Sequence, residues 1–234
     1  MDLLAYTERL RKFTFRHFPA AREIALIAYE RLLSKPPKNN VAVVGGANIE
    51  SYSQAGQDIF VQSMVKPSSS LASYVEIGSA YPQLSSNTLA LENAGWKGVS
   101  LEINPLMVEL FTGSRDNPAV EADALQVDYE QLFVRFKLPR DIGYLQIDIE
   151  PASNSLACLK KIPFQLYRFA TVTFEHDSYR EGKEIRDESR DFLLGLGYRL
   201  AVKDVKWFPF MSFEDWWVHP DLVSKKSTAL MRCP

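Results

Sequence analysis

From residue 74 onward, short apolar runs alternate with segments of helical spacing, and this alternation limits the possible folds more than any other feature of the chain. Seven runs have the length and composition of strands, namely residues 74–77, 98–102, 119–122, 143–148, 170–175, 198–202 and 216–218. Strands that alternate with helices pair in parallel, with helices on both faces of the sheet. The sequence therefore predicts an α/β fold, a three-layer α/β/α sandwich around a Rossmann-like sheet.

The N-terminal part of the chain follows a different pattern. Residues 3–33 carry apolar side chains at helical spacing, interrupted at Pro19, which predicts two helices. Pro36 and Pro37 then end any helix. With 234 residues, 46% of them hydrophobic, the chain is long enough for one well-filled domain and an appendage. We therefore expect an N-terminal helical extension, residues 1–40, through which the chain could form a homo-oligomer, and a second domain over residues 41–234.

Charge and cysteine usage exclude several classes of protein. The chain has 27 lysines and arginines against 29 acids, so no basic field favours a nucleic-acid partner. Cys158 and Cys233 are isolated, without the spacing of a metal site or a redox motif, which predicts reduced thiols in a cytoplasmic protein. No run approaches the roughly 18 apolar residues of a transmembrane helix. We expect neither a nucleic-acid partner nor a transmembrane segment.

The first predicted strand is followed by a turn typical of nucleotide-binding sites. The strand ends at Glu76, Gly78 comes next, and Ser79 and Asn87 precede an apolar helical segment. Gly78 can adopt a backbone conformation closed to other residues and allows a ligand to come close, while a helix start presents unpaired N–H groups. A carboxylate at Glu76 would repel a pyrophosphate but attract the ammonium and sulfonium groups of S-adenosylmethionine. We predict that all four residues contact this cofactor.

Acidic residues also follow the other predicted strands. In such folds ligands bind beyond the carboxyl ends of the strands, where the chain order reverses. Glu102 lies near the separation of about 20 residues expected between a glycine turn and the acid that binds a ribose. Asp123 is a candidate acceptor for an adenine amino group. The alternative is that these residues only cap the ends of their strands.

Residues 41–58 contain two further polar or glycine-rich stretches. Residues 41–46 end in two glycines but lack the third glycine of a dinucleotide motif and a following helix, which predicts a loop. Residues 53–58 predict a polar turn that caps a helix, with Gln54 as a candidate ligand contact.

The motifs together resemble those of the FkbM-type methyltransferases. They are Ser53-Gln54-Ala55-Gly56-Gln57-Asp58, Val75-Glu76-Ile77-Gly78, Ser86-Asn87-Thr88, Gly95-Trp96-Lys97-Gly98, Leu101-Glu102, Leu145-Gln146-Ile147-Asp148-Ile149-Glu150, Glu175-His176, Leu196-Gly197-Tyr198 and Asp215-Trp216-Trp217-Val218-His219. The resemblance covers most of residues 52–220. It implies a class I methyltransferase sheet of seven mostly parallel strands, S-adenosylmethionine as the donor, and O-methylation of a sugar, glycan or secondary metabolite.

Two positions depart from the family pattern. Residues 79–82 stand where the family usually has Asp-Gly, and Pro151 follows the Asp-x-Glu motif where glycine is usual. Proline fixes φ and removes a donor, so Pro82 and Pro151 would stiffen loops beside the cofactor. Either a different substrate or a degraded site would account for these changes.

Methyl transfer to a hydroxyl requires alignment and a base. His176 is the first candidate for the base and Asp148 the second, with Glu150 also facing the acceptor; alternatively, His176 only organises the loops by bonding Asp148 or Glu150. Asp148 and Glu175 are candidate ligands for Mg²⁺ or Mn²⁺, which would acidify the hydroxyl. The metal therefore stays an open alternative.

The aromatic run 207–217 fills the core or forms a platform on which a sugar ring stacks. Two other functions stay open. A nicotinamide-dependent oxidoreductase is disfavoured because the chain lacks G-x-G-x-x-G. A non-catalytic module acting through the N-terminal helices is favoured by the altered loop 79–82.

Overall fold

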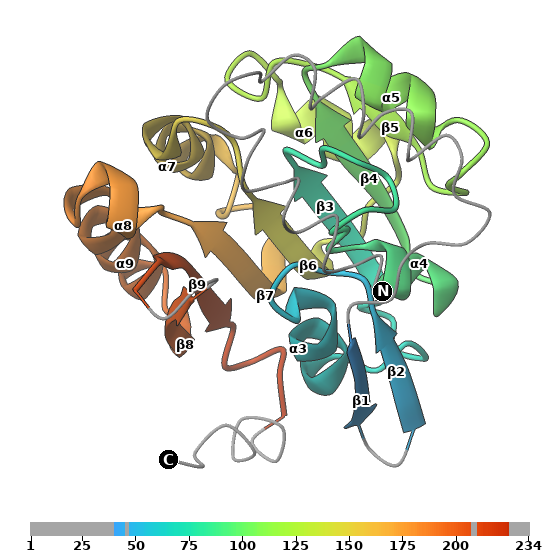
Figure 1. Ribbon diagram of the computed structural model, residues 1–234, viewed down its shortest axis with the longest axis horizontal. Helices are drawn as coiled ribbons and strands as arrows, with labels where there is room; N and C mark the ends of the chain where they lie inside the picture. The colour runs from blue at the N-terminus through green and yellow to red at the C-terminus, as the bar shows by residue number, and fades with distance from the viewer. Residues whose placement is uncertain (1–39, 45–46, 207–209, 225–234) are drawn as a thin grey trace, which may run out of the picture. The chain divides into compact units, whose positions relative to one another are not determined.

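The computed structural model describes residues 40–44, 47–206 and 210–224, all within the unit Pro37–Pro234 (Figure 1). The predicted helical extension lies outside the described residues except for Asn40, and so does Cys233. Cys158 is a buried free thiol. Among the described residues, no helix has the length and apolar character needed to cross a membrane.

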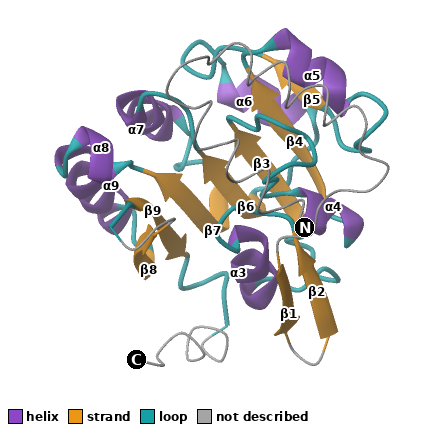
Figure 2. Cartoon of the chain, viewed as in Figure 1, coloured by secondary structure: helices purple, strands orange, loops and turns teal. Residues whose placement is uncertain are grey.

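A seven-stranded sheet forms the centre of the domain, and its strand order is β5-β4-β3-β6-β7-β9-β8 (Figure 2). The strands are β3 (Ser73–Ile77), β4 (Lys97–Glu102), β5 (Ala119–Glu121), β6 (Asp141–Ile147), β7 (Arg168–Glu175), β8 (Arg199–Lys206) and β9 (Ser212–Val218). Only β9 runs antiparallel to its neighbours. All seven predicted strands and the mostly parallel sheet are therefore confirmed. The chain order reverses between β3 and β6, which is where such sheets bind ligands.

The described helices are α3 (Gln57–Met64), α4 (Leu89–Asn93), α5 (Pro105–Phe111), α6 (Tyr129–Arg135), α7 (Ala152–Lys161), α8 (Ser178–Glu181) and α9 (Glu184–Gly195). Side-chain caps start two of them. Asn104 accepts a hydrogen bond of 3.0 Å from the N–H of Leu106 at α5, and Asp128 accepts one of 3.0 Å from Gln131 at α6. Such caps stabilise a helix by about 0.5–2 kcal/mol because they satisfy otherwise unpaired N–H groups.

Helices pack on both faces of the sheet and form the three layers. Val75 and Ile77 of β3 are buried against α6, α7 and α9, whereas Tyr74 is buried on the other face against α3 and α4. Successive side chains of a strand point to opposite faces, so a strand buried on both faces must be apolar nearly throughout. Glu76, on the same face as Tyr74, is therefore an exception that the site must explain.

Residues 41–44, the described part of the predicted loop, form a strand instead. β1 (Asn40–Val44) pairs antiparallel with β2 (Ala47–Ser51), from Asn40 opposite Ser51 to Val44 opposite Ala47. Two apolar runs separated by Gly-Gly are a hairpin signal in a sequence, and this signal agrees with the observed pair of strands.

The polar stretch 53–58 leads into α3 and includes its first two residues, but it does not cap the helix in the predicted way. The residue at the cap is Gly56, which offers no side chain. Asp58 instead accepts hydrogen bonds from the hydroxyls of Ser51 at 2.7 Å and Ser53 at 2.6 Å. These bonds tie the end of β2 to the first turn of α3.

The described part of the aromatic run 207–217 mainly fills the core. Phe213 and Trp217 are buried, and Trp216 stacks on Phe60 of α3 with ring centroids 4.9 Å apart. Phe210 is the exception, since 93% of it is exposed. Core filling is therefore confirmed for the three buried or stacked rings.

Candidate cofactor and acceptor site

The residues that end the central strands lie at one level of the sheet. Ile77 pairs with both Leu101 and Ile147, and Ile147 pairs with Phe174. The next residues along these strands are Glu102, Gly78, Asp148 and Glu175, and Glu175 pairs with Glu214 of β9. By the alternation of side chains, this row points to the face that α3 covers. Four predicted site residues and one residue that the prediction missed thus share one edge.

Gly78 packs directly against the turn that follows β6. Its φ is +81°, and a Cβ atom built on it would lie 1.7 Å from the carbonyl oxygen of Asp148. The N–H groups of Gly78 and Ser79 donate to the carbonyl of Leu101 at 2.9 and 3.2 Å, and the N–H of Asp148 donates to Ile77 at 3.0 Å. Glycine is therefore required here by the protein's own backbone. The predicted close approach of a ligand stays a prediction.

Glu76 lies beneath this turn and not at its surface. It is 2% exposed, and its carboxylate accepts hydrogen bonds from Ser100 Oγ at 2.6 Å and Thr88 Oγ1 at 2.9 Å. Burial raises its pKa, which the positive charge of Arg115 and these two bonds oppose. Glu76 thus fixes the loop that follows, and direct contact with a cationic ligand stays a prediction.

Arg115 holds the loop that departs from the family pattern. Its guanidinium is buried and donates to the carbonyl of Pro82 at 2.8 Å, Thr88 Oγ1 at 2.9 Å and Ser86 Oγ at 3.2 Å. It also forms an ion pair of 3.1 Å with Glu92. The sequence showed no signal for this role, because Arg115 stands in a charged surface-like stretch far from the turn. The altered loop is accordingly well anchored.

Glu102 closes the turn from the side of β4. Its carboxylate accepts from the N–H groups of Ala80 at 2.8 Å and Asn104 at 2.9 Å. Nearby in the chain, Ser79 Oγ and Asn87 Oδ1 are buried and have no hydrogen-bond partner among the described residues. Buried polar atoms are nearly always paired, so two unpaired atoms in one loop are consistent with a ligand-binding site.

The two other predicted cofactor residues lie outside this turn. Asp123 follows β5, where it accepts a 2.9 Å bond from the N–H of Leu125. Asp123 is exposed, and Gln54, which precedes α3, is exposed as well. Both are accessible, and a contact with a ligand remains a prediction for each.

On the acceptor side, Asp148 and Glu175 follow side by side at the ends of the paired strands β6 and β7. Burial raises the pKa of both carboxyl groups. Glu150 is exposed and forms an ion pair of 2.8 Å with Arg180. The structure therefore brings Asp148 and Glu175 together and leaves Glu150 at the rim.

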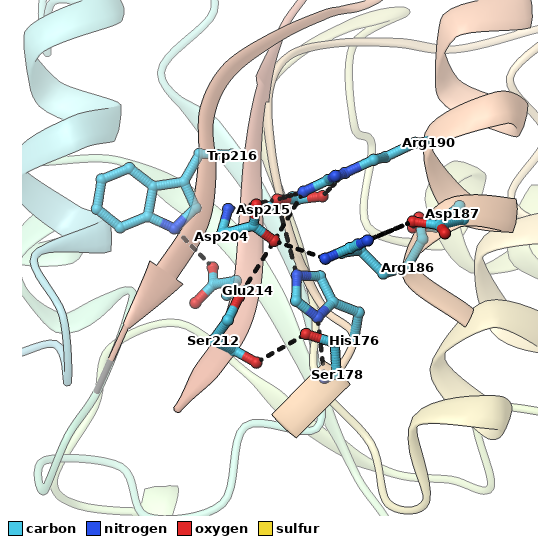
Figure 3. Close-up of polar contacts among 11 residues, drawn as sticks. His176, Ser178, Arg186, Asp187, Arg190, Asp204, Ser212, Glu214, Asp215 and Trp216 are labelled. Carbon is cyan, nitrogen blue, oxygen red and sulfur yellow. Dashed lines mark hydrogen bonds and ion pairs between the residues drawn. The ribbon is translucent and has the colours of Figure 1, made fainter. Parts of the chain in front are cut away.

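His176 points away from this edge, into a polar cluster on the opposite face (Figure 3). It is fully buried, and its Nδ1 accepts a 3.2 Å bond from the N–H of Ser178. The proton of the neutral ring is then on Nε2, which faces Asp215 Oδ1 at 3.7 Å. Nδ1 already accepts a hydrogen bond and Nε2 carries the proton, so neither nitrogen is free to take a proton from a methyl-acceptor hydroxyl. This position does not support His176 as the base. It does not bond Asp148 or Glu150 either.

Asp215 belongs to a cluster that two arginines neutralise. Arg190 donates to both oxygens of Asp215, at 2.7 and 2.9 Å, and Arg186 and Arg190 donate to Asp204 at 3.1 and 3.0 Å. Burial alone would raise the pKa of Asp215, but the bonds from Arg190 bring it down to about 2.

Among the described residues, three side chains of this cluster have a spacing that suits a metal ion. One ligand atom each of His176, Asp204 and Asp215 lies within 4.8 Å of the others. The guanidinium groups already occupy the two carboxylates. This group includes neither Asp148 nor Glu175. Among the described residues, the two predicted metal ligands therefore have no third ligand at a spacing that suits a metal ion.

Glu214 is the site residue that the sequence prediction missed. Its carboxyl group is buried and accepts hydrogen bonds from Gln57 Nε2 at 2.7 Å and Trp216 Nε1 at 3.0 Å. Burial raises its pKa to about 8, although these bonds oppose the shift. An acid in the middle of a strand of aromatic residues was the available signal.

The sheet order, with one antiparallel strand next to the last position, defines a Rossmann-like methyltransferase fold. No protein-family model and no curated protein matches the chain. Among solved structures it is similar to an O-methyltransferase from Bacillus cereus in complex with S-adenosylhomocysteine, at 14% identity over 89% of this chain and 96% of that one, with a TM-score of 0.49. It is also similar to fibrillarin from Aeropyrum pernix with bound S-adenosylmethionine, at 12% identity over 76% and 82%, with a TM-score of 0.48. Similarity of this degree carries no functional argument, so function must be argued from the site.

Proposed function

We propose that the chain is an S-adenosylmethionine-dependent methyltransferase that methylates a hydroxyl group of a sugar, a glycan or a secondary metabolite. The observation that carries this proposal is the loop after β3, at the point where the strand order reverses. There Glu102 closes the glycine turn, and Ser79 Oγ and Asn87 Oδ1 are buried without partners among the described residues. The chemistry of these donors and acceptors suits a polar, phosphate-free nucleoside.

The residues of this loop have distinct roles in the proposal. Glu102 binds the ribose, because two carboxylate oxygens offer about four acceptor sites and the N–H groups of Ala80 and Asn104 use only two. Ser79 and Asn87 contact the rest of the nucleoside or the amino-acid portion. Glu76 and Arg115 act indirectly by fixing the loop.

Methyl transfer is an in-line displacement at carbon. The bound cofactor supplies an activated methyl group on a positively charged sulfur. Asp148 is assigned as the base, since it directly follows β6 beside Glu175 and its row faces the same side of the sheet as Glu102. A well-placed base contributes a factor of about 10² to 10⁴, and alignment contributes the remainder.

Calorimetry with S-adenosylmethionine and S-adenosylhomocysteine tests the proposal. We expect the parent chain to bind both, and Glu102→Ala to weaken binding by about ten- to a hundredfold, because bonds to a charged group contribute about 1.5–3 kcal/mol. Glu188→Ala, which removes an exposed acid on α9, is the matched control and should leave affinity unchanged. Absence of binding by the parent chain would contradict the proposal.

The anchoring of the altered loop counts against the alternative of a non-catalytic module. That support was the altered loop 79–82, and this loop is tied to Arg115 through Pro82. A degraded site would more readily show a loop without such anchoring.

A further inference from the structure

We propose that Arg180 is a positioning residue of the methyl transfer, which acts by fastening α8 to the turn that carries Asp148. This inference rests on the function proposed above, because it concerns the residue assigned there as the base. Three observations carry it: the bonds that anchor α8 on β9, the contacts from α8 to the turn after β6, and the partial exposure of the arginine. Together they make α8 a connection between β9 and this turn, beyond the carboxyl end of β7 (Figure 1).

The start of α8 is anchored on β9. The N–H groups of His176 and Asp177 both donate to the carbonyl of Phe213, at 2.7 and 3.0 Å. Ser178 Oγ adds a bond of 3.1 Å to the carbonyl of Ser212. The chain turns sharply into the helix at Asp177, whose φ is +45°, a left-handed conformation that aspartate adopts more readily than most residues. This end of α8 therefore has a fixed position at the edge of the sheet.

The turn after β6 lacks a cap of its own where α7 begins. The residue before the helix is Pro151, which has no N–H group and no side-chain oxygen that could accept a bond. The N–H of Ala152, the first residue of α7, donates instead to Glu181 Oε1 of α8 at 3.2 Å. The first N–H groups of a helix stay unpaired unless a group outside the helix accepts from them. α8 thus supplies a bond that the turn cannot make itself.

Arg180 makes the second contact from α8 to this turn. Its Nη2 lies 2.8 Å from Glu150 Oε2, 2.7 Å from Asp177 Oδ2 and 3.3 Å from Glu181 Oε1. One nitrogen thus joins a carboxylate of the turn to carboxylates from both ends of α8. Glu150 follows Asp148 by two residues, so this contact restricts the turn in which the proposed base lies.

The two loops that depart from the family pattern are each held by an arginine from another part of the chain. Arg115 is buried and holds the loop that contains Pro82. Arg180 holds the turn that contains Pro151, but 42% of its side chain is exposed. Exposed ion pairs are weak and are screened by salt. The cofactor loop is therefore fixed firmly, whereas the acceptor turn is held by a contact that opens readily and closes again around an acceptor.

The test is methyl NMR on the full chain labelled with ¹³C at the isoleucine δ1-methyl groups. Ile149 is the reporter, because it lies between Asp148 and Glu150, and its Cγ2 atom would be 2.8 Å from a Cβ atom added to Gly78. Ile149→Val assigns its signal. We expect Arg180→Met to shift or broaden this signal, while the isoleucine signals of the strands stay in place.

Amide hydrogen exchange measures the size of the effect. The amide of Ala152 is protected by its bond to Glu181, which Arg180 holds in place. We expect this amide to exchange about two- to fivefold faster in Arg180→Met, the range expected for a partly exposed ion pair, and the amides of β6 and β7 to keep the rates of the parent. At 1 M salt the parent should approach the variant, because salt screens the ion pair.

Two further variants separate positioning from a general structural role. All three contacts of Arg180 are made by one nitrogen, and a lysine ammonium offers three donors, so Arg180→Lys should restore most of the parent signal and exchange rate. Arg168→Met is the matched control. Arg168 has a similarly exposed side chain, at 47%, and pairs with Asp141 at 2.8 Å at the opposite ends of β6 and β7. Its removal should change neither readout.

Three results would overturn the proposal. The first is an Ile149 signal and an Ala152 exchange rate that stay unchanged in Arg180→Met. The others are equal acceleration at every amide, or the same changes in Arg168→Met, since either would assign Arg180 to general stability. Failure of the proposed function has a different signature: calorimetry would show no binding of S-adenosylhomocysteine by the parent chain, while the response of Ile149 to Arg180→Met would persist.

Discussion

Glu214 and Asp215 are neighbours in β9, yet their side chains lie on opposite faces of the sheet in opposite electrostatic surroundings. Glu214 is buried against α3, where Gln57 and Trp216 bond to it and burial raises its pKa to about 8. Asp215 is buried against α9 beside Arg190, and its pKa is lowered to about 2. The difference shows that burial alone does not mark a functional acid. An acid with an arginine partner is consistent with a structural role, and acids held by neutral groups or by other acids cluster at the candidate site.

The strongest way to break this comparison is to remove the arginine. Arg190→Met would leave Asp215 buried without its main partner, and we expect a loss of about 3–5 kcal/mol in the free energy of unfolding. Chemical denaturation at pH 7 measures it. Since the pKa of Asp215 is lowered, its contribution is present above pH 3.8 and is lost as the pH falls through about 2.

The double variant Arg190→Met/Asp215→Asn provides the control for this loss. It removes the unpaired charge and should recover much of the stability. Equal losses in the single and double variants would contradict the view that the pair is an electrostatic unit.

A second prediction concerns the contact between Gly78 and Asp148, which joins the two halves of the site. Gly78→Ala places a side chain at a φ of +81° and within 1.7 Å of the Asp148 carbonyl. The backbone conformation costs about 1–2 kcal/mol and the forced shift about 1–3 kcal/mol more. We expect thermal or chemical denaturation to show this loss, together with weaker binding of S-adenosylmethionine.

Gly113→Ala is the matched control, because Gly113 also has a positive φ of +91°, but a Cβ atom added there would have no described neighbour within 4 Å. It should show only the smaller backbone cost and unchanged binding. If both variants lose the same stability, the contact with Asp148 has no special role.

The sequence predicted the strands well because each is short, apolar and followed by a turn. It also placed Glu102, Gly78, Asp148 and Glu175 at one edge, since the carboxyl ends of parallel strands must meet there. His176 shows the limit of that reasoning. It directly follows Glu175, and one residue along a strand reverses the direction of the side chain. Glu175 and His176 are therefore adjacent in sequence, but their side chains lie on opposite faces of the sheet.

Long-range partners account for the other misses. Arg115 bonds Pro82, and Gln57 bonds Glu214, across 33 and 157 residues of chain. No local pattern encodes such pairs, because each depends on how distant elements pack. The antiparallel pair of β1 and β2 was missed for a different reason: the Gly-Gly between the two runs was compared with one motif only, although Gly-Gly in a sequence is also a signal of a tight hairpin.

The last prediction concerns Glu214 itself and returns to the two neighbours in β9. A carboxyl group whose pKa rises from 4.5 to about 8 on folding binds its proton more tightly in the native state, so its contribution to stability is present at low pH and is lost as the pH rises through this window. Glu214→Gln keeps a neutral group of similar shape. Its stability relative to the parent should increase between pH 5 and 8, by about 1.4 kcal/mol per pH unit at most, as measured by denaturation at each pH. Asp215→Asn should show no such gain over the same range, because Asp215 is already ionised there. A flat difference for Glu214→Gln would mean that this carboxyl group stays ionised despite its burial, and the contrast between the two faces would then have to rest on geometry alone.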